Sequence, residues 1–142
     1  MARANAAYYA TRDPFADFAT APEIAQVFGE LLGAWAVVTW RTMGAPDGVI
    51  LAEAGPGNGT LMADALRLVR RLAPELHRTA RLHLVESSRR LRDVQARALA
   101  PDRPDWHDAV SALPSGPIIL FANEFLDALP IRQFERRGGA WG

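Results

Sequence analysis

The first clear pattern of hydrophobic and polar positions begins near residue 20 and has the spacing of an α-helix. Thr20 and Glu23 stand three residues apart as a capping box, and Pro22 lies between them in the first turn. The spacing predicts a helix from Glu23 to Val38, and hydrophobic residues that recur every three or four positions predict its one buried face: Ile24, Val27, Phe28, Leu31, Leu32, Trp35 and Val38. Residues 1–19 show no such pattern, and we expect an irregular lead-in to one domain spanning residues 1–142.

Beyond this helix, predicted strands alternate with predicted helices. Short hydrophobic runs predict strands at 49–52, 80–85 and 117–122, with briefer strands near 106–108 and 131–136. Amphipathic segments predict one helix after residue 59 and another capped by Ser87 or Ser88. Because strands that alternate with helices form parallel sheets through right-handed crossovers, the sequence predicts an α/β fold.

A glycine turn follows the first predicted strand at once. Gly55, Gly57 and Gly59 let the backbone approach a ligand closely, and a predicted helix begins directly after them. Thr60 breaks the dinucleotide pattern G-x-G-x-x-G, and Glu53 would repel phosphates but suits a cationic ligand such as a sulfonium amino acid. A tight turn without a ligand is the alternative, and Glu53 before the turn together with Glu86 one strand later makes us favour ligand binding.

Polar residues also follow the other predicted strands, and the carboxyl ends of parallel strands share one rim. Glu86 is placed to accept both hydroxyls of a ribose, or to sit as a favourable acid at a helix N-terminus. Asp108 is either a partner for an adenine amino group or an ordinary loop acid. Asn123, Glu124 and Asp127 are suited to hold a guanidinium or ammonium substrate, or to cap the next turn.

Composition removes several classes of protein. The chain has no cysteine and no lysine, which excludes disulfides, cysteine zinc sites, Schiff-base lysines and Walker-type phosphate loops. No metal-ligand spacing is present, and His83 is interpreted as packing within a strand. A net charge of zero argues against nucleic acid as a partner, and no hydrophobic run is long enough to span a membrane. The arginine bias favours a bacterial source, and therefore a cytoplasmic protein, over a mitochondrial-matrix one.

Several stretches resemble the MidA-like family, also called the NDUFAF-seven family, of S-adenosylmethionine-dependent methyltransferases. The similarity runs from about Tyr8 to Trp141, and the segments that carry it are DFATAPEIAQVFGELLGAW, EAGPGNGTLMADALR, LVESSRRLRDVQ, WHDAV and ILFANEFLDALPIRQF.

The resemblance implies a class I methyltransferase fold with a Rossmann-like sheet, and S-adenosylmethionine as the cofactor. It implies a protein substrate, since mitochondrial members are linked to arginine dimethylation in a complex I subunit and to complex I assembly. By position, the resemblance places the glycine turn and two acids at the cofactor: Glu53, Gly55, Gly57, Gly59 and Glu86. It also places there the T-A-P-E segment, with Thr20, Pro22 and Glu23. The N-E-F-x-D-A-L-P motif would lie beside the transferred methyl, with Asn123, Glu124, Asp127 and Pro130.

The chain departs from the family pattern in two ways. A glycine-containing loop that ends Gly-Asp in the family is replaced by Pro14-Phe15-Ala16-Asp17, so the chain differs from the family at that edge of the cofactor site. Family members are also more than twice as long, so we expect a fold that is incomplete at its C-terminus.

Three functions remain to be compared. The first is an enzyme that transfers a methyl group, with Glu124 and Asp127 orienting a guanidinium nucleophile. The second is a non-catalytic module that binds S-adenosylmethionine and grips a protein partner during assembly. The third, NAD binding in an oxidoreductase, is disfavoured by Thr60 and Glu53. The sequence leaves the oligomeric state open.

Overall fold

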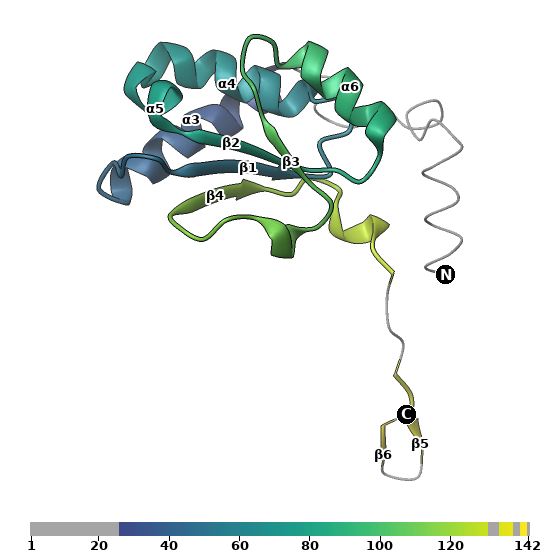
Figure 1. Ribbon diagram of the computed structural model, residues 1–142. Helices are drawn as coiled ribbons and strands as arrows, with labels where there is room; N and C mark the ends of the chain where they lie inside the picture. Colours follow the sequence, from purple (N-terminus) through teal and green to yellow (C-terminus); the bar gives the residue numbers. More distant parts are fainter. Residues whose placement is uncertain (1–25, 131–133, 138–139, 142) are drawn as a thin grey trace.

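The structure is a computed structural model that describes residues 26–130, 134–137, 140 and 141. Its main body is a parallel sheet with helices packed against it (Figure 1). In chain order the elements are α3 (Gln26–Thr42), β1 (Ile50–Ala54), α4 (Thr60–Leu72), α5 (Pro74–Thr79), β2 (Arg81–Val85), α6 (Arg89–Ala98), β3 (Asp105–His107), the short 3-10 helix η1 (Val110–Ala112), β4 (Ile118–Phe121), the 3-10 helix η2 (Leu126–Ala128), β5 (Arg136–Arg137) and β6 (Ala140–Trp141).

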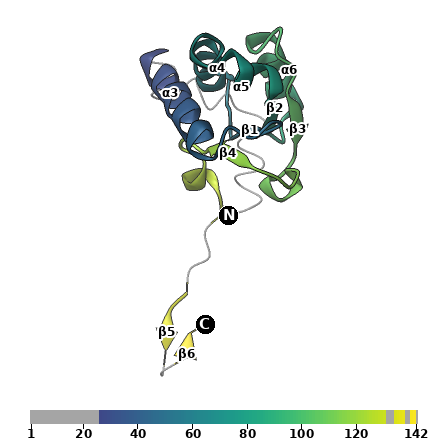
Figure 2. The same ribbon diagram turned by 90° about the vertical axis from the view of Figure 1, so that its left-hand side faces the viewer.

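The sheet confirms the predicted α/β fold. Its four strands are parallel and follow the order β3-β2-β1-β4, with Ile50 of β1 opposite Arg81 of β2 and Ile118 of β4. All five residues of the central strand β1 are buried. The described helices α3 to α6 form a layer over one face of this sheet, as the two perpendicular views show (Figures 1 and 2).

The main core lies between this helix layer and the sheet. Leu51 of β1, Leu84 of β2 and Ile119 of β4 face the helices and pack against buried side chains of α4, such as Met62 and Val69. Burial of such side chains is the main favourable contribution to folding, at roughly 25 cal/mol for each Å² of apolar surface removed from water. The core therefore fixes α4, and with it the turn that precedes α4, above the end of β1.

Helix α3 differs from its prediction in which face it buries. The large hydrophobic side chains expected to be buried are mostly exposed, at 59% for Val27, 63% for Leu31, 50% for Trp35 and 61% for Val38. Small residues carry the contact instead, and the buried positions are Gly29, Gly33, Ala36, Val37 and Trp40.

The reason is the close approach of α3 to α4. A Cβ added at Gly33 would lie 2.5 Å from the carbonyl oxygen of Ala65, and one added at Gly29 would lie 2.6 Å from the Cβ of Asp64. Only glycine allows two helix backbones to come so near. The helix also runs one turn beyond the expected end at Val38, because buried Trp40 holds that turn, donating its indole N–H to the Pro46 carbonyl at 3.0 Å.

The structure confirms most of the remaining predicted helices and strands. Helices α4 and α6 and strands β1 to β4 lie where the pattern placed them, while the short helix α5, which begins at Pro74, was not predicted. Strand β4 is buried on one side only, since Ile118 and Leu120 are 40% and 37% exposed. Residues 131–133 of the last predicted strand lie outside the described part, and β5 pairs antiparallel with β6 in a separate two-stranded sheet.

Within the described part of the chain, no helix has the length and hydrophobicity needed to cross a bilayer.

Candidate functional site

The glycine turn occupies the space between the end of β1 and the start of α4. Gly55, Gly57 and Gly59 have φ angles of 68°, 53° and 84°, all in the left-handed region that side-chain-bearing residues rarely adopt. The turn is closed by hydrogen bonds from the Gly59 N–H to the Pro56 carbonyl at 2.7 Å and from the Gly55 N–H to the Val85 carbonyl at 3.1 Å. All three glycines are therefore required by backbone conformation, whatever binds there.

Glu53 lies beneath this turn rather than on the open rim. Its side chain is only 3% exposed, and its carboxylate accepts a hydrogen bond from the Met62 backbone N–H in the first turn of α4. Burial raises the pKa of Glu53 to about 8, and the Met62 hydrogen bond offsets part of that rise. Among the described residues, the Oε2 atom of Glu53 has no hydrogen-bond partner. A buried, unpartnered carboxyl oxygen at this point would be stabilised by a cationic or hydrogen-bond-donating ligand.

Glu86 stands at the end of the neighbouring strand β2, as predicted. One carboxylate oxygen accepts from the Ser88 backbone N–H at 2.8 Å, and the other accepts from the side-chain amide of Gln95 at 3.4 Å. The Glu86 backbone N–H donates to the His107 carbonyl at 2.9 Å, which ties the end of β2 to the end of β3. The carboxylate of Glu86 is thus held in one orientation by two N–H donors.

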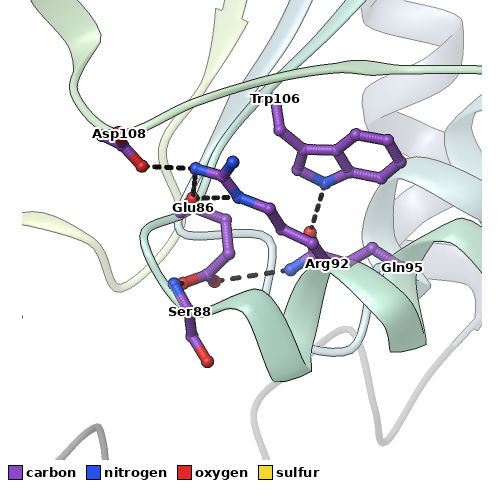
Figure 3. Close-up of polar contacts among 6 residues, drawn as sticks. All are labelled: Glu86, Ser88, Arg92, Gln95, Trp106 and Asp108. Atoms are coloured by element: carbon purple, nitrogen blue, oxygen red, sulfur yellow. Dashed lines mark hydrogen bonds and ion pairs between the residues drawn. The ribbon is translucent and has the colours of Figure 1, made fainter.

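Gln95 joins Glu86 to the glycine turn, and sequence reasoning missed it. Its side chain is fully buried in α6, and its amide nitrogen donates to the Gly57 carbonyl at 2.8 Å. Its amide oxygen accepts the indole N–H of Trp106 at 2.8 Å, as Figure 3 shows. The available signal was a polar residue four positions after Leu91, on the buried face of its helix.

Asp108 follows β3 and is paired with Arg92, a second residue that sequence reasoning missed. The Arg92 guanidinium lies 2.6 Å from the Asp108 carboxylate and also donates to the Glu86 backbone carbonyl (Figure 3). The Asp108 side chain is nevertheless 84% exposed. The arginine therefore orients Asp108 and leaves most of its surface open to a ligand.

The segment after β4 reaches the glycine turn through Phe125. A Cβ on Gly55 would lie 2.8 Å from the Phe125 ring, so this ring lies directly against the turn. Asn123 is half-buried, while Glu124 and Asp127 are exposed. Glu124 has a φ of 51°, a conformation that costs a non-glycine residue about 1 kcal/mol or more and that concentrates at functional sites.

The structure thus brings most of the predicted site residues to one rim of the sheet. The glycine turn follows β1, with Glu53 of that strand buried below it, Glu86 follows β2, Asp108 follows β3, and the Asn123–Asp127 segment follows β4. Thr20, Pro22 and Glu23 lie outside the described residues. The rim offers carboxylates, a close-approach backbone turn and a buried acid, a combination suited to a ligand with a positive charge and a ribose.

Comparisons with known proteins point to one family of enzymes. Residues 31–142 match the model of a family described as "Putative S-adenosyl-L-methionine-dependent methyltransferase". The chain is 36% identical over 159 residues to the "Protein arginine methyltransferase NDUFAF7, mitochondrial" of Danio rerio, covering 94% of this chain and 38% of that protein. The corresponding protein of Homo sapiens is 33% identical over 160 residues, with coverage of 94% and 36%.

A solved structure is similar as well. A "likely methyl transferase from Burkholderia thailandensis bound to S-adenosyl-homocysteine" superposes with a TM-score of 0.67 at 30% sequence identity, covering 87% of this chain and 32% of that one. The chain therefore spans little more than a third of the length of the curated relatives it matches.

Proposed function

Because the chain belongs to the family of S-adenosyl-L-methionine-dependent methyltransferases whose model it matches, we propose that the rim of the sheet beside its glycine turn binds S-adenosylmethionine and positions the methyl group for transfer. One observation carries the proposal. Three left-handed glycines stand between a buried acid with an unused oxygen and an oriented acid on the adjacent strand. The solved structure of a similar chain contains S-adenosyl-homocysteine, which supports the same class of ligand here.

The residues present fit this cofactor. Glu53 supplies a buried carboxyl oxygen that a methionine ammonium group would satisfy, directly or through a bridging group. Glu86 would accept the ribose hydroxyls, and Asp108 would accept the adenine amino group. The glycine turn would let the cofactor approach the main chain at Gly57, whereas the missing side chain of Gly55 leaves room for Phe125 and that of Gly59 leaves room for α6. We also assign Thr20, Pro22 and Glu23 to this site on the strength of the family motif.

The cofactor supplies an activated methyl group on a sulfonium, so the protein mainly orients and desolvates the reactants. Asn123, Glu124 and Asp127 follow β4 next to the turn, where Phe125 lies against Gly55. Carboxylates at this position would hold a guanidinium by paired, charge-assisted hydrogen bonds and spread its positive charge.

We propose a protein arginine as the methyl acceptor. The relatives are named protein arginine methyltransferases, and the acids after β4 suit a guanidinium. The family resemblance further suggests a complex I subunit as the partner, and the net charge of zero argues against a nucleic-acid partner. We place the reaction in the cytoplasm if the source is bacterial and in the mitochondrial matrix if it is eukaryotic. The names of the Danio rerio and Homo sapiens relatives describe them as mitochondrial.

A second candidate function is a cofactor-binding module that grips a protein partner without catalysis. The exposed hydrophobic residues of α3 favour this candidate, because exposed apolar patches commonly mark interaction sites.

Two measurements test the proposal. Calorimetry should show binding of S-adenosylmethionine and none of NAD; binding of NAD alone would overturn the assignment of the site. Incubation with methyl-labelled cofactor and an arginine-containing candidate protein should transfer label to arginine. Cofactor binding without any transfer across candidate substrates would favour the module instead.

A further inference from the structure

Gln95 is a buried polar side chain that connects three elements, and although it ends the family stretch LVESSRRLRDVQ, the resemblance gives it no role. It lies on α6 with no exposed surface, yet every polar atom of its amide is engaged. A buried amide without partners would destabilise the fold, so its full set of hydrogen bonds shows that the surrounding residues are arranged to hold it.

The orientation of the amide is fixed by Trp106. An indole N–H can only donate, so the atom that faces it at 2.8 Å must be the amide oxygen of Gln95. The NH₂ group is therefore turned the other way, with one hydrogen directed to the Gly57 carbonyl at 2.8 Å and the second to the Glu86 carboxylate at 3.4 Å. Rotating the amide would set its oxygen against two other acceptors.

We propose that Gln95 is a positioning residue for the cofactor site, which holds the middle of the glycine turn and the ribose acid at a fixed separation. The effect of Gln95 on cofactor binding rests on the proposed function, in which Gly57 and Glu86 contact different parts of one cofactor. A single amide that donates to both couples the two contacts. Trp106 on β3 keeps that amide in the productive orientation, so β3 supports the site through Gln95.

The direct test is Gln95→Met, which keeps the length of the side chain and removes both donors. Binding of S-adenosyl-homocysteine to the 142-residue chain should weaken by about tenfold, the scale of one or two lost hydrogen bonds. Discrimination between S-adenosyl-homocysteine and its 2′-deoxy analogue should also decrease, because the Glu86 carboxylate is no longer held in place. A merely structural role would lower the melting temperature and leave this discrimination unchanged.

Two further variants keep the test decisive. Trp106→Phe removes only the indole donor and should shift affinity and discrimination in the same direction by a smaller factor. Arg97→Met places the same new side chain at an exposed position of the same helix and should leave both unchanged. If Gln95→Met and Trp106→Phe bind both ligands as the wild type does, the inference is wrong while the proposed function stands.

Hydrogen exchange separates the inference from the proposed function. In the absence of ligand, amides of residues 57–60 should exchange faster in Gln95→Met than in the wild type or in Arg97→Met. If the wild-type chain fails to bind S-adenosyl-homocysteine, the proposed function fails, and the exchange rates still show whether Gln95 holds the turn. Unchanged exchange in that case would overturn the inference as well.

Discussion

Replacing Glu53 with glutamine should remove a large pH dependence of folding stability. The carboxyl is 3% exposed and has one hydrogen bond, from the Met62 N–H, so folding strongly disfavours its charged form. Its pKa rises from 4.5 to about 8 on folding. An acid whose pKa is raised in the folded state stabilises the fold fully below pH 4.5 and loses that contribution as the pH rises through 8.

The magnitude follows from linkage. At about 1.4 kcal/mol for each unit of pKa difference, the wild type should lose roughly 4 kcal/mol of stability between pH 5 and pH 9 relative to Glu53→Gln. Glutamine keeps the shape and the acceptor for Met62, so the two proteins should be nearly equal at pH 5 and the variant more stable at pH 9.

Urea unfolding at pH 5, 7 and 9 measures this difference. Comparing the two proteins at each pH cancels the contributions of other groups, including His83, whose pKa is lowered mainly by burial and then by His107. Glu75→Gln, at an exposed position of α5, is the matched control and should follow the wild-type curve. Parallel curves for the wild type and Glu53→Gln across this range would refute the placement of Glu53 in a buried, nearly unpartnered environment.

Three further predictions follow from the same geometry. If a methionine ammonium group satisfies Glu53, cofactor binding at pH 7 should release close to one proton, which calorimetry in buffers of different ionisation enthalpy would detect; no release would place the ammonium elsewhere. Gly57→Val should abolish cofactor binding, because a branched Cβ enters the ligand's space and the φ of 53° strains any side chain by about 1–2 kcal/mol; wild-type affinity would contradict this. Gly33→Ala should destabilise the fold by about 1–2 kcal/mol in urea, because the new Cβ meets the backbone of Ala65 at 2.5 Å and overpacking outweighs the better helix propensity of alanine. A stabilised Gly33→Ala protein would show that α3 moves away from α4 at little cost.

The parts of the site that lie at strand ends could be predicted from the sequence. Glu86 and Asp108 follow short hydrophobic runs, and parallel strands bring such positions to one rim without any knowledge of side-chain contacts. The same argument located Glu53 in the chain but not the direction of its side chain. Glu53 sits in a strand whose residues are all buried, so alternation gives no clue to which face the carboxyl occupies.

The contacts that hold those ends together could not be predicted in the same way. Gln95 lies on a helix whose apolar pattern is satisfied without it, and its partners come from residues 38 and 11 positions away in the chain. Helix α3 shows the opposite problem. Its large hydrophobic side chains dominate the pattern, yet the closest contact is made by Gly29 and Gly33, which carry no hydrophobic signal of their own.

These supports converge on the glycine turn from different directions. Glu53 accepts from the first turn of α4 beneath it, Gln95 donates to Gly57 from α6, and the ring of Phe125 lies against Gly55 from the segment after β4. Glu53 and Phe125 belong to segments that also carry candidate contacts for the cofactor or the substrate, and Gln95 donates to one such contact, Glu86. The turn is therefore pre-organised by residues that are tied directly to the site, so a change in any one support should be felt first as a loss of ligand affinity. For this reason ligand affinity, more than global stability, is the measurement that distinguishes a working cofactor site from a glycine turn that only connects β1 to α4.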